Sequence, residues 1–198
     1  TKTLPGFVLD KTPRYFIVDE NGHIAECDSQ GKANGSLDKN FLETTWKNFY
    51  TNTEFYKTDV VKKLVAGAKL KVVDKDGNIV RYLGDDNVSY LTAEWTSSSD
   101  VKKIKKLPVG DFTLIEESVP SGYVKASPVH FTVKETSDVQ KYSMIDKQLF
   151  VTKTDVTGDK EVPGAKLVVK NTDGKTMDEW TSTDKPHAVS GLEVGKTY

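Results

Sequence analysis

The sequence has few of the residues that crosslink a protein internally or anchor it in a membrane. Cys27 is its only cysteine, which excludes an internal disulfide framework and a structural zinc site built from cysteines. No hydrophobic run approaches the length of a membrane span, and residue 1 does not begin a signal peptide. Because the chain starts at Thr1 without a methionine, we expect a fragment or a processed product of a longer protein.

The sequence also lacks an excess of charge of either sign. Its 28 basic and 29 acidic residues leave a net charge of -1, which gives no electrostatic reason to bind nucleic acid or an anionic membrane. Three histidines, His23, His130 and His187, lie far apart without a serine or cysteine partner motif, so no hydrolase triad is expected. We therefore expect no enzyme with turnover, no cofactor and no metal site.

A sustained helical period is missing as well, and short strand-like runs between turn signals take its place. The segments DENG (19–22), DKDG (74–77) and NTDG (171–174) predict hairpin turns between β-branched runs. A calcium loop at the second segment is disfavoured, because its glycine is misplaced for an EF-hand. Residues 42–50 are compatible with a short helix or a strand. The whole pattern predicts an all-β protein of sandwich type.

An internal repeat divides the chain. Residues 55–77 read FYKTDVVKKLVAGAKLKVVDKDG and residues 151–174 read VTKTDVTGDKEVPGAKLVVKNTDG, and EWTS then recurs at 94–97 and 179–182. A third partial copy links PGFVLDKTP (5–13) to PSGYV (120–124). The repeat predicts one complete module at 53–148, the end of another at 1–52 and the beginning of a third at 149–198. The partial modules would expose strand edges, which a neighbouring chain could complete.

Strand alternation places an ionisable side chain among apolar ones in three segments of the middle module. These faces are Phe112, Leu114 and Glu116; Phe55 and Lys57; and Tyr142, Met144 and Asp146. An isolated buried charge is costly, so such groups pair, neutralise or react. The alternative is that they are ordinary strand-end residues that reach water or share a salt bridge. A basic run, Lys102, Lys103, Lys105 and Lys106, is expected to form a solvated sheet edge.

The middle module resembles the collagen-adhesin B-type domains (CnaB-like, SpaA-like or transthyretin-like) of Gram-positive pilins and surface adhesins. The resemblance is carried by KTD (57–59), GAKL (67–70), LPVG (107–110) and FTLIE (112–116), followed by Pro120 and GY (122–123). It implies tandem Ig-like or transthyretin-like β-sandwiches, one complete and two partial. It also implies a spontaneous isopeptide bond between Lys57 and Asp146, promoted by Glu116.

The resemblance extends to the partial modules and to function. It implies Asn48 as the acceptor in the N-terminal piece and Lys153 as the lysine in the C-terminal piece. The implied protein is a stalk fragment of a secreted adhesin or pilin on a bacterial cell wall, whose partners are neighbouring modules of the same parent chain. The alternative is an adhesin module that binds a host protein or glycan through the insertions at 27–40 or 79–92.

Overall fold

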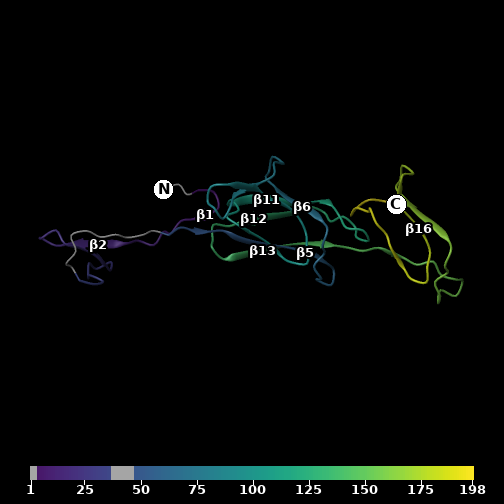
Figure 1. Cartoon of the computed structure of the whole chain (residues 1–198), viewed down its shortest axis with the longest axis horizontal. Helices are drawn as coiled ribbons and strands as arrows, with labels where there is room; N and C mark the ends of the chain where they lie inside the picture. Colours follow the sequence, from purple (N-terminus) through teal and green to yellow (C-terminus); the bar gives the residue numbers. More distant parts are fainter. Residues whose placement is uncertain (1–3, 37–46) are drawn as a thin grey trace.

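The computed structural model describes residues 4–36 and 47–198. Every secondary-structure element assigned in these residues is a β-strand, which confirms the all-β prediction. The strands form a central sandwich with a smaller group of strands at each end (Figure 1). In the described part of the chain, no helix is long and apolar enough to cross a membrane.

The central sandwich consists of two sheets. One sheet has the order β10–β5–β13, made of Lys102–Lys105, Asn52–Asp59 and Val139–Asp146. The other has the order β12–β11–β6–β9, made of Val129–Val133, Gly110–Ser118, Lys69–Val73 and Glu94–Thr96. Strands β5 and β13 run parallel, whereas the remaining pairs are antiparallel. The hairpin of β7 (Arg81–Leu83) and β8 (Tyr90–Thr92) belongs to the 79–92 insertion.

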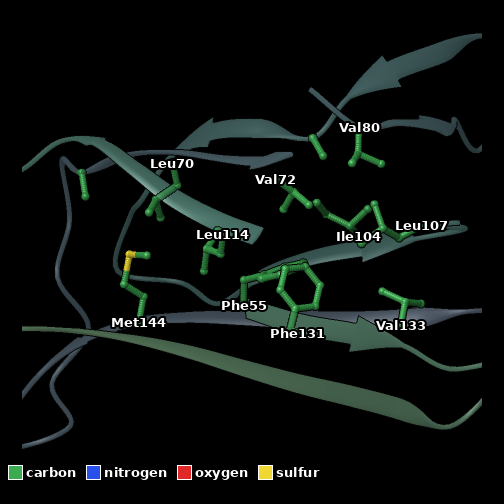
Figure 2. Packing of buried hydrophobic residues seen from close by; sticks show 12 residues of the cluster. Phe55, Leu70, Val72, Val80, Ile104, Leu107, Leu114, Phe131, Val133 and Met144 are labelled. Atoms are coloured by element: carbon green, nitrogen blue, oxygen red, sulfur yellow. The ribbon is translucent and has the colours of Figure 1, made fainter. Parts of the chain in front are cut away.

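The hydrophobic core fills the space between these two sheets (Figure 2). Phe55 of β5 lies against Phe131 of β12 with ring centroids 5.5 Å apart and an edge-on orientation. Leu114 of β11 and Met144 of β13 are each 1% exposed. Since alternate residues of a strand share a face, the core-facing sets continue into Lys57, Glu116 and Asp146, which are also buried.

The two flanking groups are built from two-stranded sheets. At the N-terminal end, β1 (Phe7–Val8) pairs with β4 (Phe49–Tyr50), and β2 (Tyr15–Val18) pairs with β3 (Ile24–Cys27). At the C-terminal end, β14 (Phe150–Val151) pairs with β17 (His187–Ala188), and β15 (Lys166–Lys170) pairs with β16 (Thr176–Thr181). Apolar residues such as Val18 and Phe150 are more than half exposed in these groups.

The repeat detected in the sequence recurs as a repeated hydrogen-bond pattern. The Gly67 amide donates to the Ser97 carbonyl over 2.9 Å, and the Gly164 amide donates to the Ser182 carbonyl over the same distance. In each copy the EWTS tryptophan pairs with the GAKL leucine across two antiparallel strands. Similar local sequence therefore produces equivalent local pairing, although the central copy pairs within a four-stranded sheet and the other copy within a two-stranded sheet.

The three hairpin turns predicted from sequence are confirmed. Gly22, Gly77 and Gly174 have φ angles of 81°, 84° and 79°, a left-handed conformation that glycine adopts without strain. Each amide donates to the carbonyl three residues earlier. Of the segment for which helix and strand were both possible, residues 42–46 lie outside the described part, and Phe49–Tyr50 forms strand β4.

Candidate crosslinking site

Two adjacent parallel strands and one strand of the facing sheet bring Lys57, Asp146 and Glu116 together. The register of β5 and β13 places Met144 opposite Lys57, so Asp146 lies one pleat further along the same face. Glu116 comes from β11 in the other sheet. The exposed fractions of the three side chains are 3% for Lys57 and 0% for both acids. The three ionisable residues thus meet inside the core.

One ammonium group faces two carboxyl groups at this point. Lys57 Nζ donates a hydrogen bond to Asp146 Oδ1 and lies 2.9 Å from Glu116 Oε1. That second contact is within ion-pair distance, but Oε1 has no hydrogen bond of acceptable geometry among the described residues, and neither has Asp146 Oδ2. Full ionisation would leave one negative charge uncompensated in the core, so the site favours the uptake of a proton.

Burial favours the protonated form of the Asp146 carboxyl. Burial raises the pKa of Asp146 to about 6, against the lowering effect of Lys57, and the nearby Glu116 carboxyl adds to the increase. A protonated carboxyl is a better electrophile than a carboxylate, because its carbon carries less electron density and its hydroxyl can leave as water. The surroundings of Asp146 therefore suit it to accept a nucleophile.

A backbone amide fixes the orientation of Glu116. The Ala126 N–H donates to Glu116 Oε2 over 2.8 Å, which turns Oε1 toward Lys57. Sequence reasoning missed this donor, because it is a main-chain group in the segment between β11 and β12 and leaves no side-chain signal. The segment between β11 and β12 thus holds Glu116 while its carboxyl contacts Lys57 of β5.

The other two predicted crosslink residues lie outside this site, one in each flanking group. Asn48 is exposed just before β4, and Lys153 is half-buried just after β14. The Lys153 amide donates to Glu161 Oε2 over 2.9 Å, and its Nζ donates to the Thr154 carbonyl over 3.3 Å. Lys153 nevertheless repeats the backbone environment of Lys57, since the carbonyl of each accepts from a valine amide of the following segment.

The expectation that the whole basic run is solvated is wrong for Lys106. This residue follows β10 in a left-handed conformation (φ 60°) that turns its side chain inward, and it is only 5% exposed. Its Nζ donates to the Gly84 carbonyl over 2.8 Å and to Asn87 Oδ1 over 2.6 Å. Lys106 thereby fastens the loop of the 79–92 insertion to the sandwich, whereas Lys103 and Lys105 remain exposed at the sheet edge.

The described residues contain few features that suggest a metal site or a ligand-binding site. Within residues 4–36 and 47–198, no three or more His, Cys, Asp or Glu side chains are grouped to hold a metal ion. The insertion hairpin exposes Val88, Tyr90 and Leu91, and the other insertion is described only as far as residue 36. The buried group of Lys57, Glu116 and Asp146 is the feature that calls for a chemical explanation.

Comparison with known proteins identifies the central part of the chain. Residues 51–148 match the family described as "SpaA: Prealbumin-like fold domain", and no curated protein matches the chain. Among solved structures, a streptococcal ancillary pilin is 16% identical, with 72% of this chain and 50% of that chain covered and a TM-score of 0.42.

Two further solved structures are similar to the chain. The Bacillus anthracis TIE protein is 20% identical, with 96% of this chain and 41% of that chain covered and a TM-score of 0.39. The shaft pilin SpaA from Lactobacillus rhamnosus GG is 15% identical, with 67% and 68% covered and a TM-score of 0.40. The chain thus spans half or less of the first two of these three proteins.

Proposed function

Since the chain belongs, over residues 51–148, to the family of SpaA prealbumin-like fold domains, we propose that it is a stalk segment of a Gram-positive surface adhesin or pilin. In this proposal the chain lies outside the cell, on the cell wall, and consists of tandem modules at 1–52, 53–148 and 149–198. Its partners are the neighbouring modules. The observation that carries the proposal is the buried contact of Lys57 with two carboxyl groups.

The proposed chemistry is a single amide-forming reaction between Lys57 and Asp146. Proton transfer within the site gives a neutral amine and a protonated Asp146 carboxyl, a combination that burial favours over the ion pair. Nζ attacks Cγ of Asp146, a C–N bond forms, and the carboxyl hydroxyl leaves with a proton as water. Glu116 gives a proton to the acceptor oxygen and receives one from the nitrogen, so it ends as it began.

Fixed proximity replaces the need for an unusually reactive amine. The fold holds Nζ in hydrogen-bond contact with the carboxyl group that it attacks, and such positioning makes intramolecular reactions far faster than their bimolecular equivalents. The product amide also removes two charges from a site where neither reaches water. The reaction is thus favoured both kinetically and by the environment of its product.

The bond would change the route by which tension crosses the module. Without it, tension between residues 52 and 146 shears the parallel pair of β5 and β13. With it, tension passes from β5 through the Lys57–Asp146 amide directly to the end of β13. Strands β6 to β12 then lie in a closed loop that carries no tension, which suits a stalk that holds something away from a cell wall.

The test is the intact mass of the full chain under denaturing conditions. We expect the chain to be one water lighter than its sequence, and Glu116→Gln to have its full calculated mass. Glu117→Gln is the matched control, because Glu117 is the next residue of β11 but is exposed and paired with Lys71 over 2.6 Å. Full mass in the unaltered chain would refute the crosslink.

A second candidate function is ligand binding by the 79–92 hairpin. The observation in its favour is that Val88, Tyr90 and Leu91 are exposed on a loop that Lys106 holds in place, and loops on rigid scaffolds commonly carry binding residues. The full chain would then bind an immobilised matrix protein or glycan, and Leu91→Ser with Tyr90→Ser would abolish that binding. Equal binding by the variant would remove the hairpin from consideration.

A further inference from the structure

One short segment touches both halves of the candidate site. Gly122 to Ala126 lies between β11 and β12, and its Val124 amide donates to the Lys147 carbonyl over 2.7 Å, directly after Asp146. Two residues later, the Ala126 amide donates to Glu116 Oε2 over 2.8 Å. The position of this segment therefore determines where Glu116 points relative to the end of β13.

The other edge of the same segment is bonded to the C-terminal group of strands. The Lys125 amide donates to the Leu192 carbonyl over 2.8 Å, and the Lys125 carbonyl accepts from the Val194 amide over 3.3 Å. The Gly122 amide donates to Ser190 Oγ over 2.9 Å. In an extended segment successive backbone groups point to opposite sides. Val124 and Ala126 thus bond the central sandwich, while Lys125 bonds residues 190–194.

A half-open pocket next to Glu116 is lined in part by the same C-terminal residues. It has a volume of about 210 Å³, and its lining includes Glu116, Ala126, Glu193 and Val194. The Glu116 side chain is nevertheless 0% exposed. If residues 190–194 moved away, the pocket would widen and water would come closer to the Glu116 carboxyl. Water there would compete with Ala126 and with Lys57 for its oxygens.

We infer that residues 190–194 position Glu116 through the 122–126 segment, so that the Lys57–Asp146 reaction is fast only when the C-terminal group has docked. This inference rests on the proposed crosslinking function. Ser190 and Val194 are positioning residues, since they act on Glu116 through Gly122, Lys125 and Ala126. In a tandem array, each module would then crosslink once the following module has begun to fold against it.

The test measures the rate of crosslinking in the full chain. The chain is made by cell-free synthesis, samples are quenched in denaturant at intervals, and intact mass gives the fraction that has lost one water. The junction variant combines Ser190→Ala with Val194→Pro, which removes the hydroxyl that bonds Gly122 and the amide that bonds Lys125. Lys57 and Asp146 stay in the core, so the variant still reacts, but about tenfold more slowly.

A matched control makes the same kinds of change elsewhere in the C-terminal group. It combines Thr183→Ala with Val156→Pro, where Val156 is exposed and is the second residue of the turn from Asp155 to Gly158, a position that proline favours. We expect the control to react at the unaltered rate. Ser190→Thr alone keeps the hydroxyl and is also expected to react at the unaltered rate, whereas Ser190→Ala alone slows the reaction.

The outcomes separate the two proposals. A slow junction variant with a fast control and a fast Ser190→Thr supports the positioning role. If the junction variant reacts as fast as the unaltered chain, or the control is equally slow, the inference is overturned while the crosslink itself stands. If the unaltered chain never loses water, the proposed crosslink fails and the inference fails with it.

Discussion

Glu116→Gln provides a sharp mechanical prediction for the central sandwich. Glutamine has nearly the same shape as glutamate, and its carbonyl oxygen can keep the hydrogen bond from the Ala126 amide. It cannot serve as the proton-transferring acid, so we expect a folded sandwich in which Lys57 and Asp146 remain unlinked. Comparison with the unaltered chain then isolates the mechanical effect of the bond.

The size of the effect follows from the positions of the linked residues. Lys57 and Asp146 are 89 positions apart, so a fully extended chain between them spans about 300 Å. In the crosslinked chain that length is hidden behind the amide. By analogy with a disulfide that closes a loop of this size, the bond would also raise the free energy of unfolding by about 4–5 kcal/mol.

Single-molecule stretching between the two ends of the chain measures this directly. The flanking groups extend equally in both proteins, so the variant should lengthen by about 300 Å more than the unaltered chain. Glu117→Gln, on the exposed face of the same strand, should behave like the unaltered chain. Equal lengthening of the unaltered chain and Glu116→Gln would refute the proposed path of tension, whatever the stability of the sandwich.

Three further predictions concern Lys106, Gly6 and the ionisation of Asp146. Lys106→Met removes the ammonium that bonds Gly84 and Asn87, and it should lower the free energy of unfolding in urea by about 2–3 kcal/mol. The control Lys105→Met, at an exposed position, should change the free energy of unfolding by less than about 0.5 kcal/mol. Equal effects of the two substitutions would contradict the role of Lys106. Gly6→Ala places a Cβ against the Lys106 carbonyl at a φ of 83°. The Thr51 amide donates to the Gly6 carbonyl, so its hydrogen should exchange with solvent about tenfold faster in this variant. An unchanged exchange rate would show that residues 4–8 do not dock against Thr51 and Lys106. Burial is the largest cause of the raised pKa of Asp146, and it remains in Glu116→Gln, so folding of this uncrosslinked variant should bind a proton and its stability should fall as pH rises above about 4. Adding Asp146→Asn should abolish that slope, and a slope that persists would assign it to another group.

The sequence by itself determined the features that depend on neighbouring residues. Strand alternation placed Glu116 with Leu114, and Asp146 with Met144, on faces that the structure buries. Turn chemistry located the hairpins at Gly22, Gly77 and Gly174. The repeat likewise identified EWTS as a recurring segment, and in the structure both copies pair with the leucine of GAKL. All these features follow from backbone geometry over a few residues, which local sequence specifies.

Only the tertiary structure decided which of these faces meet. Parallel pairing of β5 with β13 brings Asp146 beside Lys57, and packing of the second sheet adds Glu116; alternation says nothing about register between strands 89 positions apart. The inward turn of Lys106, the Ala126 amide and the contact of Lys125 with Leu192 were also invisible in the sequence. Each of these contacts depends on a main-chain group or on the backbone conformation of one residue. Main-chain amides and carbonyls are common to nearly all residue types, so the sequence does not reveal their partners, which long-range packing determines.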